Sequence, residues 1–184
     1  YRSRLDENAE AITRGMGKPL SQSRGEFEGG TVERANHLCD IAGEALADEV
    51  LPDKPGFKRY IRHEPVGVVL DIAAWNYPLV IAINVIIPSV LAGNAVLIKH
   101  AHQTAAVGEQ YARAFADAGA PAGLVQNFAV SHDTAAEVIG TRRLGYVSFT
   151  GSVRGGHEVA RTVARDNFIG AGFELGGKDG ALVL

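Results

Sequence analysis

The chain has 184 residues, of which 46% are hydrophobic and 21% are charged, and its formal net charge is −3. This length supports one domain with a substantial core, and the composition is that of an ordinary globular protein. The small acidic charge, with Lys and Arg scattered along the chain, argues against nucleic acid as the main partner. The single cysteine, Cys39, rules out an internal disulfide bond and suits a reducing compartment, so we expect a cytoplasmic protein.

No segment is expected to span a membrane. The longest apolar run, residues 79–92, is interrupted by Asn84, Pro88 and Ser89 and is shorter than the ~20 residues that a spanning helix needs. We interpret this run as a buried helix. The chain begins with Tyr1 and ends within an apolar run, so we also expect it to be a piece of a longer protein.

The first part of the chain predicts two helices. Residues 4–14 form the first helix, and the glycines and proline of residues 15–19 end it. Residues 25–30 predict a loop. Thr31 is the expected N-cap of the second helix, which runs to about residue 50 with apolar residues at helical spacing. The single cysteine lies on this apolar stripe, and we interpret it as a small core thiol rather than a nucleophile.

The rest of the chain predicts alternating strands and helices. A weak strand is expected at residues 57–62, and the later apolar runs are typical of strands buried on both faces. The alternation implies an α/β fold: a three-layer, Rossmann-like parallel sheet with helices on both faces, preceded by the N-terminal helices. The expected strands are residues 66–72, 95–98, 125–130, 144–149 and 181–184, the expected helices are 78–92, 104–118, 134–140 and 156–166, and residues 168–180 are expected to be loop or short strand.

One strand–turn–helix unit, residues 146–164, stands out in this pattern. Its strand breaks at Gly151 and Ser152, and the helix is expected to follow residues 155–156. The N–H groups at a helix N-terminus can bind a phosphate group. The segment lacks the Gly-x-Gly-x-x-Gly spacing, so an ordinary tight turn is the alternative. Ligands of parallel sheets bind at the carboxyl ends of the strands. The groups expected to meet there are Trp75, Asn76, Tyr77, Pro78, Lys99, Gly151 and Ser152.

Six short segments occur in an order that resembles a known family. They are GMGKP at residues 15–19, EPVGVV at 64–69, WNYP at 75–78, LAGNAV at 91–96, FTGS at 149–152 and ELGGK at 174–178. The chain resembles the NAD(P)-dependent aldehyde dehydrogenase superfamily over nearly its whole length. The resemblance implies that residues 1–56 are helices packing on a cofactor domain. Residues 57–184 would be the NAD(P)-binding domain, ending before the catalytic domain that holds the cysteine nucleophile.

The resemblance also implies roles for individual residues. Glu174 matches the general base, which activates water for thioester hydrolysis or helps to activate the thiol, and we expect apolar neighbours to desolvate it. Asn76 matches the donor to the oxyanion of the tetrahedral intermediate, although the residues alone favour a turn Asn. No metal site is implied. The positions that match contacts to NAD or NADP are Ile72, Ala73, Ala74, Trp75, Lys99, His102, Phe149, Gly151, Ser152, Leu175 and Gly176.

Two departures from the family's pattern concern the cofactor site. Ala74 stands where the family usually has proline before Trp-Asn. Lys99 is followed by His-Ala-His, whereas the family often has Pro-x-Glu, whose carboxylate can hold the ribose hydroxyls. Without that carboxylate a 2′-phosphate meets no repulsion, and a protonated His102 attracts one. We therefore hypothesise a relaxed choice between NAD and NADP.

A third departure concerns the nucleophile. The family's cysteine follows the ELGGK motif, and no cysteine follows it here. Because the thiohemiacetal must form before oxidation, we predict that this chain alone does not turn over aldehyde. Two alternatives to an aldehyde dehydrogenase remain: a nucleotide-binding or structural module without activity, and an enzyme that acylates coenzyme A, which Glu174 disfavours. The family resemblance implies an aldehyde substrate and assembly into a homodimer or homotetramer.

Overall fold

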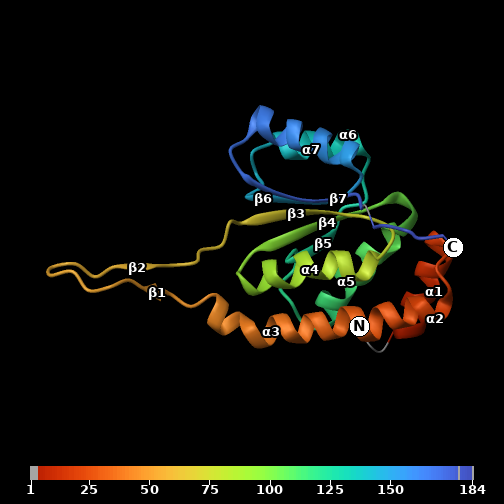
Figure 1. The fold of residues 1–184 in the computed structure, drawn as a ribbon, viewed down its shortest axis with the longest axis horizontal. Helices are drawn as coiled ribbons and strands as arrows, with labels where there is room; N and C mark the ends of the chain where they lie inside the picture. Colours follow the sequence, from red (N-terminus) through yellow and green to blue (C-terminus); the bar gives the residue numbers. More distant parts are fainter. Residues whose placement is uncertain (1–3, 178, 184) are drawn as a thin grey trace.

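A parallel sheet of five strands forms the centre of the structure, a computed structural model that describes residues 4–177 and 179–183, apart from the side chain of Asp166 (Figure 1). The strand order is β5-β4-β3-β6-β7, and every neighbouring pair is parallel. The expected α/β sheet is therefore confirmed. The strands are β3 (Val68–Ala73), β4 (Ala95–His100), β5 (Val125–Asn127), β6 (Tyr146–Gly151) and β7 (Gly170–Leu175).

Helices cover both faces of this sheet (Figure 1). One face packs on α4 and α5, and the other packs on α6 and α7, so two apolar clusters form on opposite sides of the strands. The N-terminal helices add a further layer outside α4 and α5. The helices are α1 (Leu5–Met16), α2 (Leu20–Gly25), α3 (Glu33–Ala45), α4 (Pro78–Leu91), α5 (Ala105–Asp117), α6 (His132–Gly140) and α7 (Val153–Asp166), with a short 3-10 helix η3 at His102–Thr104.

The strand order changes direction at β3, the central strand of the sheet. It enters at β3, adds β4 and β5 on one side, and then crosses back to place β6 and β7 on the other. Ligands of such sheets bind outside the carboxyl ends of the strands at this switch point. The region to search for a site is therefore the end of β3 and β6.

The segment at residues 25–30 is helical, not the loop that the glycines suggested. α2 continues through a π-helix, η2 (Glu26–Val32), into α3 without a break. Thr31 is therefore not an N-cap; its hydroxyl is buried and donates to the carbonyl of Glu26 at 3.0 Å. The glycines are tolerated because the segment packs closely: a Cβ atom on Gly30 would lie 2.6 Å from the side chain of Val80 on α4. Tertiary packing outweighs the local preference here.

Cys39 is exposed on α3, so its interpretation as a core thiol is wrong. No residue of α3 is buried, because only one side of this outermost helix meets the body of the protein. The helix ends at Ala45 rather than near residue 50, and the chain then forms a two-stranded hairpin, β1 (Glu49–Val50) with β2 (Tyr60–Ile61). This hairpin, which we call the arm, projects from the body (Figure 1). The expected boundary between residues 56 and 57 falls within the arm.

Three other expectations about the elements need correction. α7 begins at Val153 and not after residue 156, because Ser152 caps it. Residues 170–175 form a full strand, β7, rather than a mostly irregular segment. Residues 181–183 are not a strand, since no partner strand of the described chain lies beside them; Leu184, like Lys178 of the ELGGK motif, lies outside the described residues. None of the described helices combines the length and the hydropathy that a membrane span requires.

Candidate functional site

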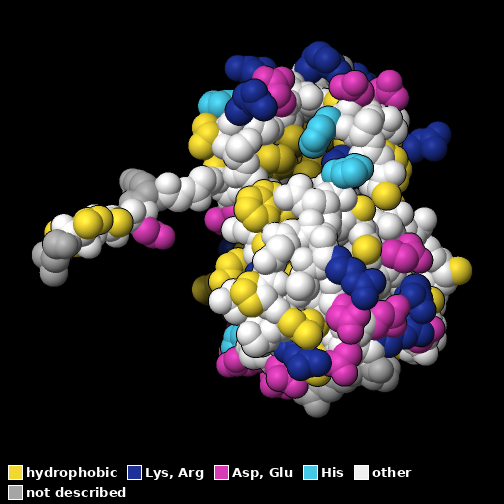
Figure 2. All heavy atoms as spheres, turned by 90° about the vertical axis from the view of Figure 1, so that its right-hand side faces the viewer, with side chains coloured by type: hydrophobic (Ala, Val, Ile, Leu, Met, Phe, Trp, Pro, Cys, Tyr) yellow, Lys and Arg dark blue, Asp and Glu magenta, His cyan; other side chains and the backbone are white. Residues whose placement is uncertain are grey.

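A cavity of about 970 Å³ lies at the carboxyl ends of four strands, between the sheet and the pair α6 and α7. This is the end of the sheet that Figure 2 faces, and histidine side chains are visible there between the two layers. The cavity brings together nearly all of the residues predicted from the sequence. Those that line it are Ile72, Ala73, Ala74, Trp75, Asn76, Lys99, Phe149, Gly151, Ser152, Glu174, Leu175 and Gly176.

The turn between β6 and α7 forms one wall. Ser152 is the N-cap of α7, and its Oγ accepts a hydrogen bond from the N–H of Gly155 at 3.1 Å. The remaining N–H donors of the first turn belong to Val153 and Arg154, since these have no partner within a helix. A first turn with free donors and a helix dipole behind it is suited to an anionic group such as phosphate.

Phe149 explains why this turn is built from glycine. A Cβ atom on Gly151 would lie 2.8 Å from the Phe149 ring, and one on Gly155 would lie 2.7 Å from it. Both distances are too short for a real side chain, so only glycine lets the ring pack against the turn. The ring also contacts Phe173 on β7, with 6.5 Å between the ring centroids.

Lys99, at the end of β4, lies on another wall of the cavity. It pairs in register with Ile72 of β3, so its side chain lies on the sheet face that α6 and α7 cover. The residue is buried, and the loss of water around it lowers the pKa of its ammonium group. It makes no ion pair with any described residue. An ammonium group without an ion-pair partner is suited to donate a hydrogen bond to a ligand oxygen, such as that of a ribose hydroxyl or a phosphate.

The histidines differ from the sequence-based expectation. His102 is exposed and, within the described chain, is not part of the cavity wall, because η3 turns the backbone away directly after β4. His132, the first residue of α6, lines the cavity instead. His100 is buried beneath α5, and burial together with the charge of Lys99 lowers the pKa of its imidazole to about 4. Among the histidines of the described chain, the one at the cavity is therefore His132.

Asn76 lines the cavity from a loop and Glu174 lines it from a strand. Asn76 lies in the loop between β3 and α4, and its exposed side chain makes no hydrogen bond with the described residues. Glu174 lies near the end of β7, in register with Thr150, and its Cβ points to the face opposite that of Phe173. Glu174 is exposed rather than desolvated as we expected, because β7 is the edge strand of the described sheet.

The wall that α6 and α7 provide was not predicted from the sequence. The lining residues of each helix recur at intervals of three and four, which places them on one side of the helix. That spacing was visible in the sequence, but it is the same as the spacing of core residues. The lining residues that were not predicted are Ala101, His132, Ala135, Ala136, Ile139, Thr150, Arg154, Gly155, Glu158, Val159 and Thr162.

No cluster of His, Cys, Asp or Glu that could hold a metal ion occurs among the described residues.

Comparison with known proteins shows the family of this fold and site. The model of the aldehyde dehydrogenase family matches residues 1–184. This chain belongs to that family. The NAD(P)+-dependent succinate semialdehyde dehydrogenase Sad of Escherichia coli K12 is 34% identical over 188 residues, which cover all of this chain and 39% of the relative. The 3,6-anhydro-alpha-L-galactose dehydrogenase of Streptomyces coelicolor is 35% identical over 94% of this chain and 35% of its own length.

Solved structures agree with this assignment. The succinic semialdehyde dehydrogenase of Streptococcus pyogenes, solved in complex with NADP+, superimposes with a TM-score of 0.90 at 31% identity and covers 97% of this chain. An NAD-dependent aldehyde dehydrogenase from Sinorhizobium meliloti gives a TM-score of 0.87, also at 31% identity. The chain spans 38% of the first structure and 35% of the second, so it corresponds to well under half of these enzymes.

Proposed function

We propose that this chain is the cofactor-binding part of an enzyme that oxidises an aldehyde to a carboxylic acid with NAD or NADP. The observation that carries the proposal is that one cavity gathers a helix N-terminal turn suited to phosphate, a Lys99 without an ion-pair partner, an amide donor and a carboxylate. Residues 57–184 supply the cofactor site, and residues 1–56 support it from outside α4 and α5. The nucleophilic cysteine lies outside these residues.

The cavity, at about 970 Å³, is large enough for a dinucleotide. The first turn of α7 holds the pyrophosphate, with Ser152 fixing the turn and glycine allowing close approach. Lys99 donates to the adenosine ribose. His132 also lines the cavity, and we propose that it contacts the 2′-phosphate of NADP, which replaces the role first given to His102 and keeps the prediction that both NAD and NADP are used. The bound cofactor supplies the acceptor of the hydride.

Asn76 and Glu174, which also line the cavity, serve the aldehyde. When the thiolate attacks the aldehyde carbonyl, its oxygen becomes negative, and the Asn76 amide donates a hydrogen bond to it without titrating. Glu174 takes a proton, either from the attacking thiol or from the water that hydrolyses the thioester. A nucleotide-binding module without activity has no use for either group.

The complete gene product tests this function directly. We expect aldehyde-dependent formation of NADH and of NADPH, with release of free acid, and the 184-residue chain alone should show none. Succinate semialdehyde and 3,6-anhydrogalactose are suitable first substrates, since relatives are named for them. Activity that requires coenzyme A and yields its thioester would identify the acylating alternative. Cofactor binding without turnover of any aldehyde would identify the inactive module.

Replacing Glu174 with glutamine separates its two possible tasks. If Glu174 activates only the hydrolytic water, the complete enzyme with Glu174→Gln gives a burst of about one equivalent of NADH and then stops, because the acyl-enzyme accumulates. If it also activates the thiol, the burst itself is slowed. Stopped-flow measurement of NADH decides between them. Steady-state turnover at the wild-type rate would contradict both roles.

We also propose that the arm docks on a second copy of the chain. An isolated two-stranded hairpin is marginally stable in water. The arm exposes Val50, Phe57 and Ile61, with exposed fractions of 78%, 63% and 47%. The double variant Phe57→Asp/Ile61→Asp should convert a dimer or tetramer of the complete protein to monomers in analytical ultracentrifugation. Ile41→Asp, at an exposed site on α3, is the control and should leave the mass unchanged.

A cytoplasmic location is proposed from the free, exposed thiol of Cys39.

A further inference from the structure

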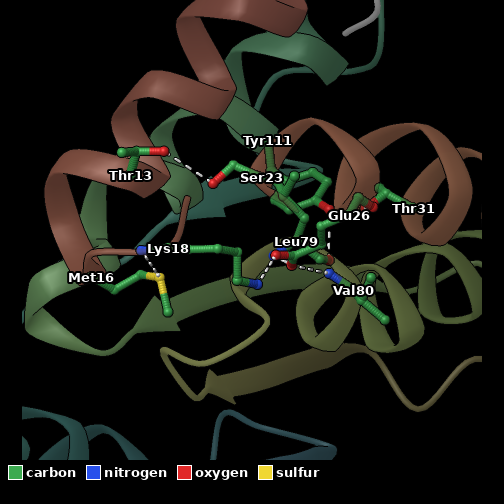
Figure 3. A network of polar contacts seen from close by, with 9 residues as sticks. All are labelled: Thr13, Met16, Lys18, Ser23, Glu26, Thr31, Leu79, Val80 and Tyr111. Atoms are coloured by element: carbon green, nitrogen blue, oxygen red, sulfur yellow. Dashed lines mark hydrogen bonds and ion pairs between the residues drawn. The ribbon is translucent and has the colours of Figure 1, made fainter. Parts of the chain in front are cut away.

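Lys18 and Glu26 form a buried ion pair beneath the start of α4 (Figure 3). Their side chains are 7% and 1% exposed, and Lys18 Nζ lies 2.5 Å from Glu26 Oε2. Lys18 lies in the turn between α1 and α2 and Glu26 begins η2, whereas α4 begins more than fifty positions later in the chain. The pair therefore connects two parts of the protein that no local signal in the sequence links.

Glu26 caps α4 with its second carboxylate oxygen. Oε1 accepts hydrogen bonds from the N–H groups of Leu79, at 2.8 Å, and Val80, at 3.2 Å. The residue next to the helix in the sequence does not cap it, because the side chain of the N-cap Tyr77 makes no capping hydrogen bond. Pro78 has no N–H group, so the donors of the first turn that need a partner begin at Leu79. Glu26 thus satisfies the free donors of the first turn and places a negative charge at the positive end of the helix dipole.

The capped first turn of α4 fixes one end of the loop that carries Asn76. This loop, residues 74–77, joins the end of β3 to the start of α4. Trp75, Asn76 and Tyr77 are all exposed. The position of the loop is therefore set by its two ends and by Lys18, whose Nζ lies 3.8 Å from the centre of the Tyr77 ring.

The π-helix η2 brings Glu26 into place. Glu26 is its first residue, and the hydroxyl of Thr31 donates to the Glu26 carbonyl at 3.0 Å. Gly30 packs closely on the side chain of Val80, so the same segment lies directly against α4. π-helical turns often occur at functional sites, where the wider turn redirects side chains.

A buried ion pair is weak evidence for stability, since apolar residues of the same volume often stabilise a fold as well. We propose that Glu26, with its charge balanced by Lys18, is a positioning residue that fixes the Asn76 loop at the cavity. The catalytic consequence rests on the function proposed above for Asn76. The effect on the loop itself does not depend on that function, so the two can be tested separately.

Trp75 reports on this loop, because it is the only tryptophan of the chain. The variants should replace both partners together, so that no buried charge is left unpaired. Lys18→Met/Glu26→Leu removes the cap, whereas Lys18→Met/Glu26→Gln is equally neutral but keeps an oxygen that can accept from both N–H groups. Tyr111→Phe is the control: it removes the 2.8 Å hydrogen bond to the carbonyl of Leu79 from the same turn and leaves the cap intact.

In the 184-residue chain, we expect loss of the cap to lower the fluorescence anisotropy of Trp75 and to raise its quenching by acrylamide. Tyr111→Phe should resemble the wild type, and the Gln variant, which keeps the cap and loses the contact of Lys18 with Tyr77, should lie much closer to the wild type than the Leu variant does. In the complete enzyme, the Leu variant should lower kcat about 100-fold with little change in KM, since small misplacement of a catalytic group has effects of this size. Unchanged Trp75 signals in the Leu variant, or no rescue by Gln, would overturn the proposal. An inactive wild-type enzyme would refute only the function of Asn76, because the Trp75 measurement would still decide on the loop.

Discussion

Replacing Asn76 with alanine is expected to lower kcat of the complete enzyme by a factor of about 10²–10³, the usual effect of losing one oxyanion donor. The amide lies at the cavity with no hydrogen-bond partner among the described residues, so it is free to donate to the developing negative oxygen. The loss should appear in kcat because the donor acts on the transition state more than on the bound aldehyde. Asn76→Asp should be at least as damaging, since a carboxylate repels the same oxygen.

The control for this experiment is Asn84→Ala. Asn84 is exposed on α4, the helix that follows the Asn76 loop, and accepts only a surface hydrogen bond from Arg34. It should leave kcat at the wild-type value, and both variants should bind NAD as the wild type does. A wild-type kcat for Asn76→Ala would contradict the oxyanion role. A loss of cofactor binding in that variant would show that Asn76 acts on the cofactor site instead.

Asp71 is expected to make the protein less stable as the pH rises. It lies in the middle of β3, is 0% exposed, and neither carboxylate oxygen has a hydrogen-bond partner among the described residues. Burial raises its pKa well above the ordinary value, because the charged form cannot be solvated. The folded state therefore holds this proton more tightly than the unfolded chain. Above the unfolded pKa, near 4, the free energy of unfolding falls by ~1.4 kcal/mol per pH unit until the folded pKa is reached.

Urea unfolding of the wild type and Asp71→Asn from pH 5 to pH 8 measures this effect. Asn has the same shape and does not titrate, so the stability of the variant relative to the wild type should increase with pH. His100 acts in the opposite sense between pH 4 and 6.5: its folded pKa of about 4 lies below its ordinary value of 6.5, so rising pH favours folding there. Taking the difference between the two proteins removes that contribution. A difference that does not change with pH would show that Asp71 is paired or hydrated in solution.

The sheet and the turn at its end could be predicted because their signals are local. Buried parallel strands are continuous apolar runs, and the β6–α7 turn combines a cap residue with glycine, so Gly151 and Ser152 were expected at the carboxyl end of β6, where the structure has them. The loop predicted at residues 25–30 was wrong; it was expected because glycines usually break a helix. Here the close contact of Gly30 with α4 outweighs that preference, and nothing in the nearby sequence shows it.

Other features depend on residues that meet only in the folded protein. The cap on α4 joins Glu26 to a helix that begins more than fifty positions later, which no motif spacing encodes. His132 and not His102 reaches the cavity, because a single turn of 3-10 helix decides where the chain points after Lys99. The exposure of Glu174 follows from the edge position of β7, which requires knowledge of the strand order.

Titration of the 184-residue chain with NAD+ and NADP+, followed through Trp75, tests the central claim most directly. Trp75 lines the cavity, and the chain has no other tryptophan to obscure its signal. We predict saturable quenching with both cofactors, and weaker binding in Lys99→Ala because the ligand loses its contact with the buried ammonium group. No saturable change, or equal affinity in wild type and Lys99→Ala, would contradict the assignment of this cavity as the cofactor site.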